Sequence, residues 1–215
     1  MLFDYPRELR TNQALVVGMH AFFAKLGIAS PIFIGASDGG MVAQIYTQNE
    51  VGGLVLVSTG GMDAATLKNL KKKYFFVPLA LWYMAHCNYE KLKPRLIQSG
   101  MSHLRNESAE EAAYARDMFK TIFKNFQQAK DVHITGLLAD LMNQTPVTEA
   151  DFRALKGRIL LIFPNQDFFS DQMQQDPIKL MQDPQIVYVS GGHLGTVLKA
   201  GDYVREIKKF LEGME

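Results

Sequence analysis

Residues 31–39 read PIFIGASDG and place Ser37 two residues after one glycine and two residues before another. The apolar run 31–34 predicts a short strand, and apolar residues that recur at helical spacing over 41–46 predict a helix. A serine at so sharp a strand-to-helix turn has strained backbone geometry, and small residues on both sides of it avoid a clash between strand and helix. The stretch therefore predicts a nucleophile elbow with Ser37 as the candidate nucleophile.

The residues that follow complete a strand–turn–helix–strand unit. Gly52 and Gly53 end the predicted helix, and the apolar run 54–57 predicts a second strand. At the start of the helix, the backbone N–H of Asp38 faces outward and the helix dipole favours developing negative charge. We therefore expect the Asp38 N–H to form one half of an oxyanion hole.

Two further apolar runs lie far downstream, and each is followed by a titratable residue. Residues 158–163 precede Asp167, and residues 185–189 precede His193. A nucleophile, an acid and a histidine thus appear in the order Ser37, Asp167, His193, each just past the carboxyl end of a predicted parallel strand. Open α/β sheets place their functional sites at this edge.

This order and placement resemble the α/β-hydrolase superfamily, from Phe3 to about Leu211, with a less recognisable middle. The resemblance implies an α/β fold with a mostly parallel sheet flanked by helices. It also implies that His193 takes the Ser37 proton and returns it to the leaving group, while Asp167 orients the imidazole. No metal or organic cofactor is implied.

The acid loop departs from the family pattern. The family often has glycine three residues before the acid, whereas this chain has Pro164. Because the loop could therefore differ in shape, Asp171 and Asp63, the latter after the second predicted strand, stay open as alternative acids.

The start of the chain differs from that of a full-length family member. Residues 3–6 resemble the end of the strand that lies one helix before the elbow strand, and residues 11–27 predict that helix. Its expected buried side chains are those of Leu15, Val16, Met19, Phe22, Phe23 and Leu26.

Roughly three strands, a helix and the loop with the first oxyanion donor would normally precede this point. No His-Gly pair precedes Ser37, so we interpret the chain as N-terminally shortened or as a fragment. Strand 31–34 would then be an exposed apolar edge that favours self-association.

The middle of the chain predicts a helical cap. We expect a hydrolase core over 1–61 and 156–215, interrupted by a cap over 62–155. Ser108 with Glu111 three residues later predicts a capping box that opens a helix to Phe126, and a second helix is expected over 132–142. The apolar and aromatic run 74–85 is a candidate lining for the substrate pocket.

Composition limits the classes of function. A chain of 215 residues with 47% apolar content suits a substantial core, and a net charge of +1 argues against a nucleic-acid partner. Cys87 is the single cysteine, so no intramolecular disulfide can form. No apolar run has the roughly 18 residues that a membrane span needs, and no signal-peptide pattern opens the chain. We expect a cytoplasmic protein with a small-molecule substrate that has an apolar portion.

Together, the motif and the resemblance imply a serine hydrolase that acts on an ester, a thioester or a related small carbonyl compound. Acyl transfer, perhydrolysis and carbon–carbon bond hydrolysis use the same triad and stay open. The competing interpretation is a non-catalytic α/β-hydrolase-like protein, or an inactive fragment that lacks half of the oxyanion hole.

Overall fold

A computed structural model describes most of the chain. The described residues are 11–47, 51–73, 75–76, 79, 83, 89–102, 104, 107–125, 140–141, 143–167, 169 and 171–214.

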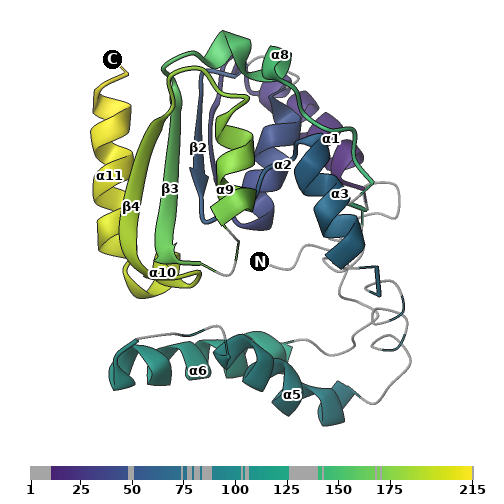
Figure 1. The fold of residues 1–215 in the computed structure, drawn as a ribbon, viewed down its shortest axis with the longest axis vertical. Helices are drawn as coiled ribbons and strands as arrows, with labels where there is room; N and C mark the ends of the chain where they lie inside the picture. Colours follow the sequence, from purple (N-terminus) through teal and green to yellow (C-terminus); the bar gives the residue numbers. More distant parts are fainter. Residues whose placement is uncertain are drawn as a thin grey trace.

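Four parallel strands form one sheet in the order β1-β2-β3-β4, as the alternation of strands and helices predicted (Figure 1). Their bounds are β1 Ile32–Ala36, β2 Gly53–Val57, β3 Ile159–Gln166 and β4 Gln185–Gly192. The predicted strands are therefore confirmed, although β3 and β4 continue about three residues further than their apolar runs. These extensions carry polar residues to the edge where the site lies.

Helices cover both faces of the sheet. On one face lie α1 Asn12–Lys25, α2 Asp38–Tyr46, α3 Ala64–Lys73 and α9 Asp171–Ile178, and on the other lies α11 Ala200–Glu212. Short helical turns connect the elements: α8 Glu149–Phe152, η3 Arg153–Leu155 and α10 Gly195–Leu198.

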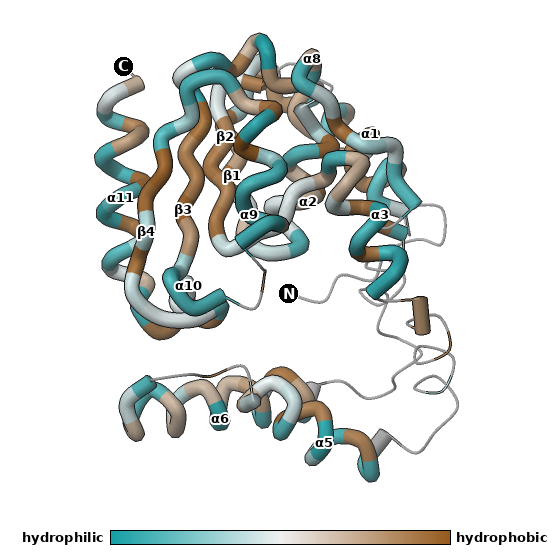
Figure 2. The backbone as a smooth tube through the Cα atoms, in the orientation of Figure 1, coloured by the Kyte–Doolittle hydropathy of each residue, from teal (hydrophilic) through white to brown (hydrophobic). Residues whose placement is uncertain are grey.

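The sheet separates two apolar clusters. Along β2, Leu54 and Leu56 pack toward α1 and α2, whereas Val55 and Val57 pack toward α11. Every residue of β2 is buried, which explains why this strand is apolar without alternation (Figure 2). Each fully buried Leu or Val contributes about 1.5–3 kcal/mol relative to exposure, so the clusters fix the sheet that positions the site.

The β1 edge of the sheet is half covered. Phe33 is buried and packs edge-on against Phe23 of α1, whereas Ile32 and Ile34 on the opposite face of the strand are 43% and 54% exposed. The predicted helix over 11–27 is confirmed as α1, but of its six expected buried residues only Val16 is buried: Leu15, Met19 and Phe23 are half-buried, and Phe22 and Leu26 are exposed. Phe22 and Leu26 are 57% and 56% exposed, because α1 turns its Val16 side toward the core.

Two antiparallel helices, α5 Tyr89–Met101 and α6 Ala109–Asn125, lie below the carboxyl ends of the strands (Figure 1). The predicted capping box opens α6: the Ser108 N–H donates to Glu111 Oε2 at 2.7 Å, and the Glu111 N–H donates to Ser108 Oγ at 3.2 Å. Most of the helix predicted over 132–142 and most of the run 74–85 lie outside the described residues. Leu67 of α3 and Phe152 of α8 pack in the same core as the sheet, and the cap boundaries at 62 and 155 stay a prediction.

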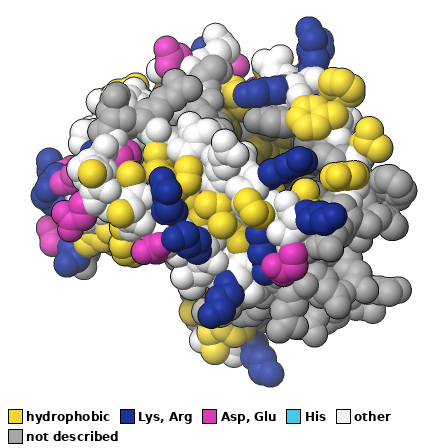
Figure 3. Space-filling view, turned by 90° about the horizontal axis from the view of Figure 1, so that it is seen from below, with side chains coloured by type: hydrophobic (Ala, Val, Ile, Leu, Met, Phe, Trp, Pro, Cys, Tyr) yellow, Lys and Arg dark blue, Asp and Glu magenta, His cyan; other side chains and the backbone are white. Residues whose placement is uncertain are grey.

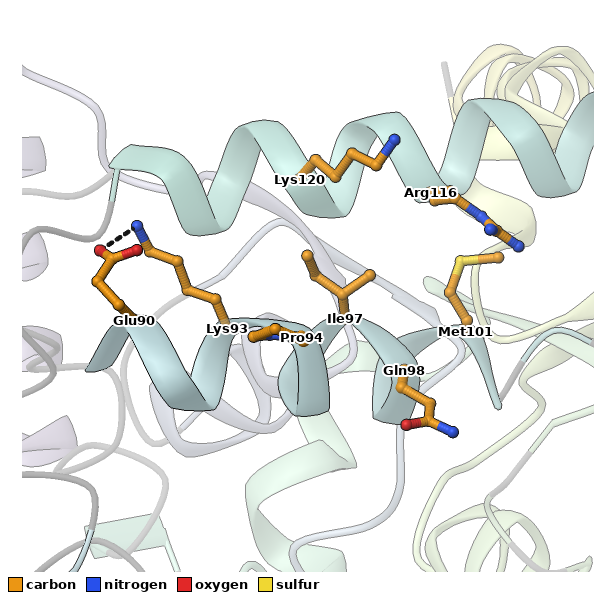
Figure 4. A pocket seen from close by; sticks show the side chains of 8 residues that line it. All are labelled: Glu90, Lys93, Pro94, Ile97, Gln98, Met101, Arg116 and Lys120. Atoms are coloured by element: carbon orange, nitrogen blue, oxygen red, sulfur yellow. Dashed lines mark hydrogen bonds and ion pairs between the residues drawn. The ribbon is translucent and has the colours of Figure 1, made fainter. Parts of the chain in front are cut away.

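A groove of about 560 Å³ runs between α5 and α6 (Figure 4). Ile97 points between the two helices, Glu90 and Lys93 pair at one end, and Arg116 lies near Met101 at the other. Seen from below, the molecule shows Lys and Arg side chains distributed around apolar ones (Figure 3). Ser37, Asp167 and His193 are not among the residues that line this groove.

Candidate active site

The turn after β1 has the strained geometry that the elbow requires. Ser37 has φ 52° and ψ −123°, a left-handed conformation that costs a non-glycine residue free energy. Two contacts hold the turn: the Ser37 N–H donates to Val57 O at 3.0 Å, and Thr59 Oγ1 donates to Ser37 O at 2.7 Å. The neighbouring strand β2 and the loop after it therefore fix the position of Ser37.

The glycine before Ser37 has the predicted role, whereas the glycine two residues after Ser37 does not. A Cβ on Gly35 would lie 2.5 Å from Gly39 O, and a Cβ on Gly40 would lie 2.7 Å from Thr59 Cβ. A Cβ on Gly39 would meet nothing within 4 Å, so the expectation that position 39 must be small is wrong. The close approach lies one residue later, where α2 crosses the loop after β2.

This difference predicts a matched pair of stability effects. Gly35→Ala should lower the free energy of unfolding by about 1–3 kcal/mol or more, because backbone atoms cannot move away from the new methyl group. Gly39→Ala should leave stability unchanged or raise it by up to about 1 kcal/mol, since alanine favours a helix. Urea unfolding followed by circular dichroism measures both, and equal losses in the two variants would contradict the described packing.

Three strand ends bring the predicted nucleophile, base and acid together. Ser37 Oγ lies 3.0 Å from His193 Nε2, and His193 Nδ1 lies 2.9 Å from Asp167 Oδ1. The Asp167 side chain is 1% exposed, and that of His193 is 15% exposed. This geometry suits a neutral imidazole that donates from Nδ1 to the carboxylate and accepts the serine hydroxyl proton at Nε2.

Phe169 supports the acid and the base at once. Its backbone N–H donates to Asp167 Oδ1 at 3.2 Å, and its ring lies edge-on to His193 at 5.7 Å between ring centroids. A backbone N–H stabilises the ionised carboxylate, and a ring beside the imidazole limits its rotation.

The two alternative acids have other environments. Asp63 accepts a hydrogen bond from the Thr66 N–H at 2.9 Å at the start of α3, and Asp171 is exposed at the start of α9. Within the part of the chain that the structure describes, Asp167 is the carboxylate that hydrogen-bonds His193. The unusual Pro164 coincides with an irregular register between β3 and β4 at 164–166, after which the chain reaches Asp167.

The loop that carries His193 is held from two sides. Asn165 Oδ1 accepts from the Gly191 N–H at 3.1 Å, and Glu107 Oε1 accepts from the Gly192 N–H at 3.4 Å. Gly191 has φ 110°, a conformation that favours glycine. Sequence reasoning missed both acceptors; for Asn165 the only signal was its place in the acid loop, and for Glu107 no local pattern gave a signal.

Burial raises the pKa of two groups at the site. It raises the pKa of the Asp38 carboxyl, and the nearby His193 partly offsets the rise. Burial also raises the pKa of Tyr203 on α11; a contact with the Ser58 hydroxyl lowers it, and the charge of Asp167 raises it further. The Tyr203 hydroxyl, Ser58 Oγ and Asp167 Oδ2 are all buried, and none of them has a hydrogen-bond partner among the described residues.

The described residues hold neither a metal-binding cluster nor a membrane-spanning helix. No group of three or more His, Cys, Asp or Glu there could hold a metal ion. None of the helices described is both long and apolar enough to cross a membrane.

Comparisons with known proteins give a match at the level of structure. No protein-family model matches the sequence, and no curated protein matches it. Among solved structures, MenH from S. aureus matches with a TM-score of 0.71 at 17% identity, over 95% of this chain and 76% of that one. A thermophilic esterase from Thermogutta terrifontis matches with a TM-score of 0.65 at 16% identity, over 95% of this chain and 73% of that one.

A third matching solved structure is that of a protein described as an α/β-hydrolase enzyme. MGS-M2, an α/β-hydrolase enzyme from a Medee basin deep-sea metagenome library, matches with a TM-score of 0.66 at 14% identity, over 96% of this chain and 74% of that one. The protein therefore has the α/β-hydrolase fold, as the resemblance implied. Identities this low establish the fold alone.

Proposed function

We propose that the protein is a serine hydrolase that cleaves an ester, a thioester or a related small carbonyl substrate with an apolar portion. The observation that carries the proposal is the hydrogen-bonded row from Ser37 through His193 to a buried Asp167. The strained turn at Ser37 and the described esterase with the same fold support it.

In the proposed reaction, Ser37 Oγ attacks the carbonyl carbon while its proton moves to His193 Nε2. The Asp167 carboxylate stabilises the imidazolium, and the Asp38 N–H donates to the oxyanion. The imidazolium then protonates the leaving group, and the bond between it and the carbonyl carbon breaks. Water, deprotonated by His193, attacks the acyl-enzyme and releases the acid, which restores the Ser37 hydroxyl. A thiol or alcohol in place of this water would give acyl transfer, and hydrogen peroxide would give perhydrolysis.

The alternative is a non-catalytic protein with the same fold. It rests on the sequence before Ser37, which holds no His-Gly pair to supply a second oxyanion donor. One such donor is worth about 10²–10³ in turnover, so its loss would slow the reaction without removing the triad chemistry.

Pre-steady-state hydrolysis of p-nitrophenyl esters separates the two functions. A serine hydrolase should release a burst of one p-nitrophenolate per chain as Ser37 is acylated, followed by slower turnover. Esters from acetate to octanoate test the apolar portion, and we expect kcat/KM to rise with acyl length. Linear release at the rate of the His193→Ala variant, with no burst, would favour the non-catalytic protein.

We also propose a cytoplasmic location, and self-association through the edge of β1, which among the described strands pairs with β2 alone. The edge strand carries the exposed Ile32 and Ile34, and an unpaired apolar strand tends to pair with another chain. Ile34→Lys should shift the protein toward the monomer, because a lysine on an edge strand opposes pairing.

Sedimentation velocity over a range of concentrations measures this effect. The control is Val204→Lys, which adds the same charge at an exposed position of α11 and should sediment like the wild type. A wild-type protein that stays monomeric at every concentration would refute the proposed self-association.

A further inference from the structure

Glu107 is a buried carboxylate in the short connection between α5 and α6. Its side chain is only 2% exposed, although it lies next to the exposed capping residue Ser108. Carboxylates are rarely buried to this extent without a partner of opposite charge or hydrogen-bond donors. We therefore expect a cation or a hydrogen-bond donor next to the Glu107 carboxylate, and both are found in the segment that carries His193.

Two groups face the Glu107 carboxylate, one from that loop and one from the turn before α11. The Gly192 N–H donates to Oε1 at 3.4 Å, and Lys199 Nζ lies 3.7 Å from Oε2. Gly192 directly precedes His193, and Lys199 directly precedes α11. The carboxylate thus joins the α5–α6 pair to both ends of the segment that presents the base.

The opposite side of the same loop is fixed by the sheet. Asn165, at the end of β3, accepts the Gly191 N–H at 3.1 Å. One amide of the loop is therefore held by the sheet, while the next is held by the helical pair. The hydrogen bond from the Gly192 N–H to Glu107, called the tie below, is the longer of the two. Because Glu107 is 85 positions away in the sequence, the tie depends on where α5 and α6 lie.

We propose that Glu107 is a positioning residue that couples the placement of the α5–α6 pair to the alignment of His193 with Ser37. When the α5–α6 connection lies against the loop, the carboxylate holds the Gly192 amide and pairs with Lys199. When the pair moves away, the loop loses one of its two anchors, and Nε2 loses its alignment with Ser37 Oγ. This inference rests on the proposed function, because its catalytic consequence requires His193 to act as the base.

Three variants test the tie through the rate at which a fluorophosphonate probe reacts with Ser37. Glu107→Ala removes the acceptor and should slow the reaction about 10- to 100-fold, the scale of a misplaced catalytic group. Glu107→Gln keeps an acceptor for the Gly192 amide and should stay within about threefold of the wild type. Glu110→Ala, a matched loss of an exposed carboxylate in the first turn of α6, should react like the wild type.

Steady-state kinetics separate positioning from substrate binding. The loss in Glu107→Ala should appear in kcat, with KM changed less than threefold, because the tie acts on the base. A loss confined to KM, or a rate for Glu107→Ala equal to that of Glu110→Ala, would overturn the proposal. Circular dichroism confirms that each variant is folded before its rate is interpreted.

Hydrogen exchange tests the tie without relying on catalysis. Peptides that cover 185–199 should exchange faster at Gly192 in Glu107→Ala than in the wild type, with no change in Glu110→Ala. If the wild type fails to react with the probe but the exchange result holds, the proposed function fails while the tie stands. If exchange at Gly192 is the same in all proteins, the tie itself is wrong.

Discussion

Replacement of Ser37 by alanine should lower kcat for p-nitrophenyl ester hydrolysis by about 10⁶, the loss expected when the nucleophile of a serine triad is removed. The reason is chemical: Ser37 Oγ lies 3.0 Å from the base, and alanine leaves His193 Nε2 with no hydroxyl to deprotonate. Fold and stability should be preserved, because the hydroxyl makes no contact that the core needs. Stopped-flow assays of the burst and of steady-state turnover measure the effect.

Ser190→Ala is the matched control for this variant. Ser190 lies on β4 three residues before His193, is exposed, and should tolerate alanine with full turnover. If Ser37→Ala retained turnover within tenfold of the wild type, another group would be the nucleophile and the mechanism would be wrong.

Asp167→Asn should lower kcat by about 10⁴. An asparagine amide can donate to His193 Nδ1, which favours the tautomer with its proton on Nε2. That nitrogen then cannot accept the Ser37 proton. The positions of the side chains should not change, because the wild-type distances from His193 to residue 167 and to Ser37, 2.9 Å and 3.0 Å, suit either tautomer. Steady-state kinetics measure the loss, and KM should change much less than kcat.

The two alternative acids provide the controls. Asp171→Asn alters an exposed residue at the start of α9 and should retain turnover within about twofold of the wild type. Asp63→Asn should affect mainly the cap of α3, which Asp63 makes through the Thr66 N–H. A large loss in either variant, with only a few-fold loss in Asp167→Asn, would move the role of the acid to that residue.

The sequence was sufficient to predict the sheet and the order of the site residues. Parallel strands end at one edge, so residues that follow the apolar runs must meet there whatever the length of chain between them. Ser37, Asp167 and His193 are such residues, and the structure brings them into a hydrogen-bonded row. Their catalytic roles stay a prediction.

Other features depend on packing that no local pattern encodes. Gly40 rather than Gly39 is confined, because Thr59 of a different segment approaches it. Phe22 and Leu26 have the spacing of a buried face, but α1 presents Val16 to the core and leaves them exposed. Glu107 contacts a loop 85 residues away, and neither its neighbours nor the capping box indicates a buried carboxylate.

The most direct test of the serine-hydrolase function is mass spectrometry of the protein after reaction with a fluorophosphonate probe. Trypsin releases residues 26–68 as one peptide that holds Ser30, Ser37 and Ser58, so fragmentation can assign the modified serine. The proposed mechanism predicts one adduct per chain on Ser37 in the wild type and none in His193→Ala under the same conditions. The absence of an adduct in the wild type, or an adduct on Ser30 or Ser58, would contradict it.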